Sequence, residues 1–388
     1  MQVSGTVDPR FEPVRDAFRG NFAGRGELGA AVTVIVDGRT VVDLWGGVAD
    51  RATGRPWTPE TMAIIFSCTK AATALCAHML VARGRLDLEA PVARYWPEFA
   101  AADKGQIPVR MLLNHQAGLP AIDQPLPPET IFNWAGMTAA LAAQAPHWAP
   151  GSAHGYHAMT FGWLVGEVVR RISGQSVGTF FHHEVAGPLA LDFWIGLPAA
   201  LEPRVATERM PPPLPEVTPL MAALLDRTSL TSKTFMNPPG LMMPGQVNSR
   251  AVHAAEIPAA NGIATARGLA GMYAPLACGG GLGGVELVDR TVLRSMSAVE
   301  SEGEDRVLLL PTRFASGFMK TIDNRPGDSI IMGPNPEAFG HGGAGGSVGM
   351  ADPVARVAIG YAMNQMGAGV LLNRRGQALI DAVYESLG

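Results

Sequence analysis

Ser67 and Lys70 are the two residues whose types and spacing most clearly suggest chemistry. They stand three positions apart at the start of a predicted helix, where residues at that spacing share a face, so the Lys70 amine can lie beside the Ser67 hydroxyl. A serine hydroxyl becomes a useful nucleophile when a neighbouring group accepts its proton, and a lysine can do this when burial lowers its pKa. A capping serine followed by a solvated lysine is the alternative, but the apolar run 63–66 favours the catalytic interpretation.

Tyr156 could add a second proton-transfer group. It follows Pro150-Gly151 and comes just before a predicted helix, and a phenol placed there could relay a proton between Lys70, the nucleophile and a leaving group. A half-buried tyrosine that bonds the backbone is the alternative. His157 is expected near the same pocket because it adjoins Tyr156.

A glycine-rich segment near the carboxyl end could supply the remaining parts of a site. His341, Gly342 and Gly343 stand before Ala344 and are predicted to open a strand. Glycines there permit a substrate to approach the backbone closely, and the strand edge offers an N–H donor. A bulge without a chemical role is the alternative.

Taken together, these residues resemble the family VIII carboxylesterases, which are similar to the class C β-lactamases. The shared order is Ser-x-x-Lys, then a tyrosine, then a basic residue with glycines. Residues 109–119, Val-Arg-Met-Leu-Leu-Asn-His-Gln-Ala-Gly-Leu, also resemble a stretch that recurs in that superfamily, and the resemblance covers almost the whole chain. It implies an acyl-enzyme on Ser67, a Lys70/Tyr156 proton relay and an oxyanion hole made by the N–H groups of Ser67 and Ala344. The substrate would be contacted by His341, Gly342, Gly343 and His157.

Two departures from the β-lactamases favour esters as substrates. Those enzymes usually carry Asn where this chain has Ala158, and Lys-Thr/Ser-Gly where it has His341-Gly342-Gly343. Both changes remove polar groups that bind the amide and carboxylate of a β-lactam. We therefore expect a serine esterase that hydrolyses a small-molecule, short-chain carboxylic ester without a metal or cofactor, with its oligomeric state left open. An acyltransferase, a β-lactamase, a D-aminopeptidase-type amidase and a catalytically silent binding protein on the same scaffold are the alternatives.

Two further motifs are weaker candidates. Residues 345–349, Gly-Gly-Ser-Val-Gly, match a nucleophile elbow, which needs a following helix and a histidine later in the chain. The last histidine is His341 and residues 350–363 are predicted as strands, so Ser347 is not expected to be a nucleophile. Histidine pairs at 154/157 and 182/183 lack the further ligands of a metal site, and no metal is predicted.

The elements that position these residues follow from hydrophobic periodicity. Residues 31–36 and 40–44 are predicted to form a hairpin around Asp37-Gly38, and residues 346–350 and 354–363 a second pair of strands. Strands at both ends of the chain indicate one antiparallel sheet. Helical spacing of apolar residues predicts helices over 14–22, 72–80, 161–172 and 379–387.

The expected fold class is α/β (α+β) with a β-lactamase-like fold, an antiparallel sheet flanked by helices plus a mostly helical domain. Residues 1–66 and 253–388 are predicted to form a discontinuous α/β domain. Residues 67–252 would form the helical domain, with the active site in the cleft between the two.

Composition sets limits on partners and location. Charged residues make up only 16% of the chain and the net charge is -4, so no basic surface for nucleic acid or an anionic membrane is expected. The sequence contains no run of some eighteen apolar residues, which is about the length that a helix needs to span a bilayer. Early charged residues and prolines leave no room for a secretion signal, and three cysteines without metal-ligand spacing suit a reducing compartment. We expect a cytoplasmic enzyme.

Overall fold

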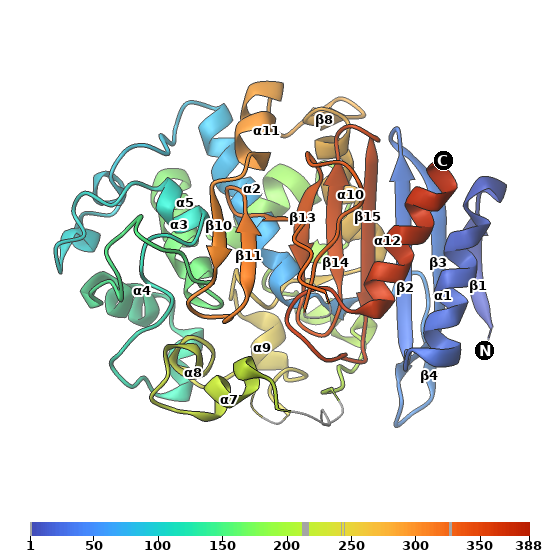
Figure 1. The fold of residues 1–388 in the computed structure, drawn as a ribbon, viewed down its shortest axis with the longest axis horizontal. Helices are drawn as coiled ribbons and strands as arrows, with labels where there is room; N and C mark the ends of the chain where they lie inside the picture. Colours follow the sequence, from blue (N-terminus) through green and yellow to red (C-terminus); the bar gives the residue numbers. More distant parts are fainter. Residues whose placement is uncertain (1, 212–216, 242, 244, 326–327) are drawn as a thin grey trace.

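Residues from both ends of the chain build one antiparallel sheet, as the sequence predicts. The computed structural model describes residues 2–211, 217–241, 243, 245–325 and 328–388. β15, near the carboxyl end, pairs with β2, near the amino end, along its whole length (Figure 1). Across the sheet the strands follow the order β1 (Val3–Val7), β3 (Arg39–Asp50), β2 (Gly29–Val36), β15 (Val357–Met363), β14 (Val348–Asp352), β13 (Phe339–Gly342), β12 (Met319–Lys320), β11 (Pro311–Phe314) and β10 (Ser301–Glu304), with β4 (Arg55–Pro56) paired to β3.

The two predicted strand pairs have different outcomes. The first is confirmed, since β2 and β3 reverse at Asp37 and Gly38, which take the positive φ angles of 50° and 74° that this turn requires. In the second, β14 continues to Asp352 and β15 begins only at Val357, so the predicted strand start at residue 354 is wrong. Asp352 explains the difference, because its Oδ1 accepts the N–H groups of Val354 and Ala355 at 2.8 and 2.9 Å and turns the chain there.

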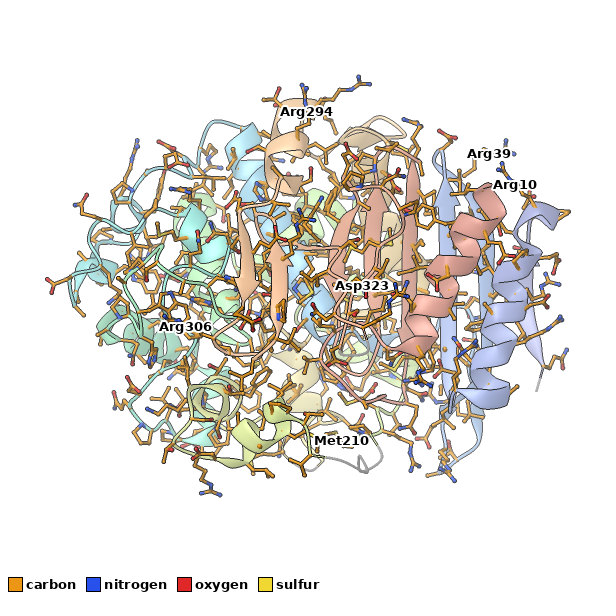
Figure 2. The ribbon with its side chains drawn as sticks, in the orientation of Figure 1. Arg10, Arg39, Met210, Arg294, Arg306 and Asp323 are labelled. Atoms are coloured by element: carbon orange, nitrogen blue, oxygen red, sulfur yellow. The ribbon has the colours of Figure 1, made fainter. Side chains whose placement is uncertain are left out.

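Helices cover both faces of the sheet. On one face α1 (Glu12–Gly24) and α12 (Arg374–Leu387) lie side by side, and both were predicted from their apolar spacing (Figure 1). Arg10 lies at the carboxyl end of α12, where its side chain donates hydrogen bonds to the last carbonyls of that helix (Figure 2). On the other face α10 (Ala266–Ala277) packs so closely that a Cβ at Gly360 would overlap its backbone.

The remaining helices form the other side of the molecule, around α2 (Thr69–Ala82) and α5 (Thr160–Ser173) (Figure 1). Both were predicted, and both end where a glycine takes a left-handed conformation, at Gly84 and Gly174. The others are α3 (Arg110–Leu113), α4 (Trp134–Ala143), α6 (Val177–Phe181), α7 (Pro219–Leu225), α8 (Leu230–Met236), α9 (Arg250–Ala254) and α11 (Arg290–Ser297).

Two small sheets complete the fold. β5 (Ala63–Ile64), β7 (Ile263–Ala264) and β6 (Phe193–Trp194) pair in that order, and β8 (Gly281–Leu282) forms a hairpin with β9 (Val285–Glu286). The division into a discontinuous α/β domain and a helical domain stays a prediction. In the described part of the chain, every helix is too short or too polar to cross a membrane.

Candidate active site

Ser67 is partly exposed within a segment that is otherwise buried. Every residue of 61–80 is buried except Ser67, which is half-buried. The residue before it, Phe66, has a φ of 44°, a left-handed conformation that is costly for an aromatic residue and needs support from its surroundings. Thr69 gives that support, because its hydroxyl donates to the Phe66 carbonyl at 2.5 Å and accepts the Gly262 N–H at 2.8 Å. The strained turn therefore projects the Ser67 hydroxyl away from the core.

Lys70 lies on the first turn of α2, directly behind Ser67. Its Nζ lies 3.2 Å from Ser67 Oγ, 2.7 Å from the carbonyl oxygen of Ala158 and 2.9 Å from that of Ala259. The side chain is fully buried, and this burial lowers the pKa of Lys70 well below its usual range. All three partners are uncharged oxygens, so no carboxylate offsets the cost of burying an ammonium ion.

Tyr156 brings a phenol to the same place. Its ring lies under the Lys70 amine, with Nζ 4.6 Å from the ring centroid, and stacks on Phe314 at a centroid distance of 6.0 Å. The hydroxyl is buried without a hydrogen-bond partner in the described chain. Burial raises the pKa of Tyr156, and the nearby Ser67 side chain lowers it by a smaller amount. The two hydroxyls are close, but their geometry is not that of a hydrogen bond.

Asp305 fixes the backbone of Tyr156, and sequence reasoning missed it. Its Oδ1 accepts the N–H groups of Tyr156 at 3.0 Å and of Val307 and Leu308 at 2.8 Å each, while Oδ2 accepts the Thr312 hydroxyl at 3.1 Å. The carboxylate is buried and shared by four donors. Its local bonds are those of an aspartate turn, a pattern that a sequence can suggest, but the contact with Tyr156 spans 149 residues.

His157 lies beside Tyr156 but turns both ring nitrogens to the backbone. Nδ1–H donates to the Gly155 carbonyl at 2.7 Å and Nε2 accepts the Leu119 N–H at 3.0 Å. Its own N–H donates to His115 Nδ1 at 3.1 Å. Burial lowers the pKa of His157 to about 3, so the ring is neutral. The contact between His157 and substrate stays a prediction, and the bonds present here anchor the loop that carries Tyr156.

His341 stands across from Tyr156, with the two ring centroids 6.1 Å apart. Its Nδ1–H donates to the Gly342 carbonyl at 2.7 Å, which leaves Nε2 as the acceptor nitrogen. Its own carbonyl accepts the Cys68 thiol at 3.1 Å, so Cys68 points away from Ser67 and joins the start of α2 to β13. Burial, with the nearby Lys70 charge, lowers the pKa of His341 to about 3. This histidine is a neutral polar group.

The segment around Ala344 is a turn, which corrects the prediction that His341 to Ala344 open a strand. His341 and Gly342 end β13, and the chain reverses over residues 343–347. Gly343 N–H donates to the Ser347 carbonyl at 2.7 Å and Gly346 N–H to the Gly343 carbonyl at 3.0 Å. Gly345 and Gly346 have φ angles of 84° and 122°, which only glycine adopts readily, and this is why the strand stops.

The turn lies directly against the serine segment. A Cβ at Gly343 would overlap the carbonyl oxygen of Ile65, so only glycine permits this approach. Within 338–352, Ala344 is the single residue that is not fully buried, just as Ser67 is within its own segment. The N–H groups of Ser67 and Ala344 make no hydrogen bond to any described residue. Both N–H groups belong to partly exposed residues and are therefore free to donate to a ligand.

The weaker motifs form no second site in the described residues. Ser347 is followed by β14 rather than a helix, and its hydroxyl is buried without a partner, so the strand-to-helix turn of a nucleophile elbow does not form there. No group of three or more histidine, cysteine, aspartate or glutamate residues in the described ranges is arranged to bind a metal ion.

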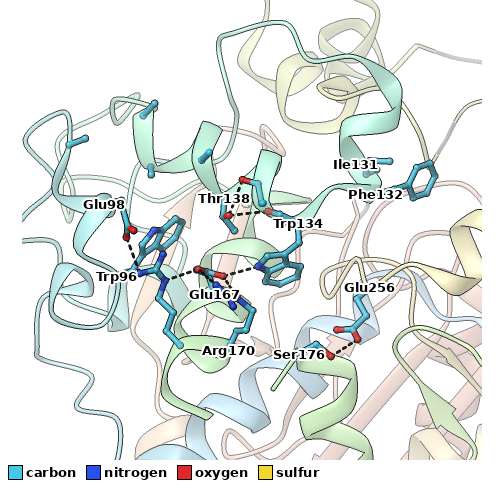
Figure 3. Close-up of a pocket in the computed structure, with 16 residues that line it drawn as sticks. Trp96, Glu98, Ile131, Phe132, Trp134, Thr138, Glu167, Arg170, Ser176 and Glu256 are labelled. Atoms are coloured by element: carbon cyan, nitrogen blue, oxygen red, sulfur yellow. Dashed lines mark hydrogen bonds and ion pairs between the residues drawn. The ribbon is translucent and has the colours of Figure 1, made fainter. Parts of the chain in front are cut away.

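A cavity of about 840 Å³ lies elsewhere, in the helical part of the molecule (Figure 3). At its centre the buried Glu167 carboxylate accepts hydrogen bonds from Trp134 Nε1 at 2.7 Å, Arg170 Nε at 2.7 Å and Arg171 Nε at 2.6 Å. None of the candidate catalytic residues lines it. The charge of Glu167 is therefore compensated by two arginines.

Comparison with known proteins identifies the family of this chain. The beta-lactamase family pattern matches residues 14–383. The esterase/beta-lactamase LipL of Mycobacterium tuberculosis is 37% identical, with 94% of this chain and 83% of LipL covered. A family VIII carboxylesterase of known structure is 39% identical with a TM-score of 0.90, and a penicillin-binding protein homologue from Caulobacter crescentus is 39% identical with a TM-score of 0.89; each covers 100% of both chains. This chain belongs to the beta-lactamase family and is a serine hydrolase related to the carboxylesterases.

Proposed function

We propose that this protein hydrolyses short-chain carboxylic esters through an acyl-enzyme on Ser67. The observation that carries the proposal is the set of partners around Lys70. A neutral amine has two N–H groups and one lone pair, and the carbonyls of Ala158 and Ala259 can only accept hydrogen bonds. They take both N–H groups, so the lone pair is left for the Ser67 hydroxyl, which then donates to Nζ.

Acylation uses that contact. As Ser67 Oγ attacks the ester carbonyl carbon, its proton passes to Lys70 Nζ and a C–O bond forms. The N–H groups of Ser67 and Ala344 donate to the oxygen on which negative charge develops. The intermediate collapses by breaking the bond to the alcohol oxygen, which leaves with the proton from Lys70. Water then attacks the acyl-enzyme by the same route, releasing the carboxylic acid and restoring Ser67.

Tyr156 completes the proton relay. Its hydroxyl has no hydrogen-bond partner among the described residues, and its ring lies against the Lys70 amine. Its raised pKa keeps it protonated, so it donates to the departing alcohol oxygen and is reprotonated through Lys70. Lys70 and Tyr156 act as a coupled pair, so an apparent pKa measured for the reaction belongs to the pair and not to either residue.

The polar groups of the candidate site favour an ester over a β-lactam. His341 is neutral, so it cannot pair with the carboxylate of a penicillin as an ammonium group would. Ala158 offers a methyl group, and its carbonyl is already bonded to Lys70. The missing charge-assisted hydrogen bond is worth about 1.5–3 kcal/mol and the missing neutral one about 0.5–1.5 kcal/mol, so the two losses together correspond to roughly a hundredfold in rate. A short ester needs only the nucleophile, the relay and the oxyanion donors.

Two measurements on one preparation test the proposal. Treatment with a fluorophosphonate, followed by peptide mass mapping, should place the adduct on Ser67; an adduct on Ser347 or none at all would contradict it. The second measurement is kcat/KM for p-nitrophenyl acetate and butyrate beside benzylpenicillin and nitrocefin. The esters should be better by about a hundredfold or more. If benzylpenicillin equals the esters, the substrate assignment is wrong.

A further inference from the structure

The turn that carries Ala344 is poorly fixed by its own sequence. Two consecutive glycines, Gly345 and Gly346, occupy its positive-φ positions, and only two hydrogen bonds close it from within. Glycine accepts many backbone conformations, so such a turn has little intrinsic preference for one shape. The Gly343 carbonyl, which shares a peptide plane with the Ala344 N–H, accepts the Gly346 N–H, so the direction of the Ala344 N–H depends on how contacts from outside the turn hold Gly345 and Gly346.

Those contacts converge on one carbonyl. The oxygen of Gly345 accepts Gly367 N–H at 2.9 Å, Asn373 Nδ2 at 2.6 Å and Arg375 Nη2 at 3.1 Å. Asn373 is also the N-cap of α12, where its Oδ1 accepts the N–H of Arg375 at 3.0 Å. Two of these three donors, Asn373 and Arg375, lie at the beginning of α12 and hold the turn against it.

Arg375 is in turn held by a buried ion pair. Its Nη1 lies 2.9 Å from Glu27 Oε1, and both side chains are almost completely buried. The Tyr361 hydroxyl donates to the other oxygen of Glu27, and Arg375 Nη2 also bonds the Gln365 carbonyl at 2.5 Å. Glu27 lies between α1 and β2, so the pair connects the beginning of the sheet to the Ala344 turn.

We infer that Glu27 and Arg375 are positioning residues that orient the Ala344 N–H toward the ester oxyanion. The inference rests on the proposed function. The guanidinium fork can bind Glu27 and the Gly345 carbonyl at the same time, which an ammonium group cannot reproduce in the same geometry. Because Gly343 already lies against the Ile65 carbonyl, any shift of the turn changes the spacing between the two N–H donors.

The test compares Arg375→Lys and Glu27→Gln with Arg374→Lys, a matched change at the exposed neighbour on the same helix. Active sites are first counted by the burst of p-nitrophenol from p-nitrophenyl acetate, so that misfolded protein does not enter the rates. Removing an oxyanion donor costs about 100- to 1,000-fold, so a misdirected donor should lower kcat by roughly 10- to 100-fold. KM should change little, and Arg374→Lys should match the wild type.

A second readout separates positioning from general structural support. Phenylboronic acid forms a tetrahedral adduct on a catalytic serine, and its Ki should rise in proportion to the fall in kcat/KM. A purely structural role would lower the number of active sites and leave Ki unchanged, which would overturn the inference. The isosteric Glu27→Gln and the milder Tyr361→Phe provide folded variants if Arg375→Lys does not fold. If Ser67 in the wild type is not acylated, the proposed function fails; if it is acylated and the variants keep kcat and Ki, only this inference fails.

Discussion

Lys70 and Lys104 are both fully buried and each has three oxygen partners, yet the two sites differ in kind. Lys104 Nζ donates to the carbonyls of Ala101, Ala142 and Gln144 at 2.7–2.8 Å. Three acceptors without a proton of their own hold an ammonium group with three N–H donors. At Lys70 one of the three partners is the Ser67 hydroxyl, which can donate, and burial lowers the pKa of Lys70 much further. The Ser67 hydroxyl is therefore what distinguishes Lys70, the candidate base, from Lys104, whose role is structural.

Removing that hydroxyl should have the largest effect. In Ser67→Ala, turnover of p-nitrophenyl acetate should fall by about a thousandfold or more, because the hydroxyl that is hydrogen-bonded to Lys70 Nζ is lost. Circular dichroism and thermal unfolding should show that the fold persists. Retention of more than roughly a tenth of the wild-type rate by the folded variant would remove Ser67 from the mechanism.

Exchanging each lysine for arginine tests the comparison itself. Arginine stays charged in proteins and cannot act as a base near neutral pH, so Lys70→Arg should lower kcat by about a thousandfold. Lys104→Arg keeps a cation among three carbonyls and should keep ester hydrolysis within about threefold, while its larger side chain costs roughly 1–3 kcal/mol of unfolding free energy. Equal losses of activity in the two variants would show that the sites do not differ as described.

Tyr156→Phe should separate activity from stability. The change removes a buried hydroxyl that has no hydrogen-bond partner in the described ranges, so the free energy of unfolding should stay the same or rise by up to about 1 kcal/mol. Loss of the relay should lower kcat for ester hydrolysis by about 10- to 100-fold. Denaturant unfolding and steady-state kinetics on the same samples measure both; a stable variant with full activity would exclude the phenol from proton transfer.

The smallest effect is expected at Ser347. Its hydroxyl is buried and has no partner in the part of the chain that the structure describes, and its backbone carbonyl closes the Ala344 turn. Ser347→Ala should therefore keep kcat within about threefold of the wild type. If Ser347→Ala folds normally but is completely inactive, Ser347 and not Ser67 would be the candidate nucleophile.

The sequence predicts the parts of the site that depend on local spacing. The contact between Ser67 and Lys70 follows from a three-residue step at a helix start. Strands predicted near both ends of the chain indicate one sheet, in which β2 pairs with β15. The catalytic roles of these residues stay predictions.

The rest of the site depends on contacts that leave no local pattern. The carbonyls of Ala158 and Ala259 belong to the backbone, so no residue type marks them as partners of Lys70. Asp305 contacts Tyr156 across 149 residues. The strand predicted to open at His341 to Ala344 instead ends at Gly342, and the chain turns where Gly345 and Gly346 take positive φ angles. Such features are set by tertiary packing, which overrides local preference.

The pH dependence of Ser67 acylation tests the central claim most directly. The rate constant can be measured from the burst phase with p-nitrophenyl acetate, corrected for the spontaneous reaction. Since burial lowers the pKa of Lys70 well below its ordinary value of 10.5, the amine should already be neutral on the alkaline side of neutrality. A plateau there is the predicted result. A rate constant that climbs about tenfold with each pH unit toward 10.5 would show that Lys70 is an ordinary charged lysine, and would contradict its assignment as the base.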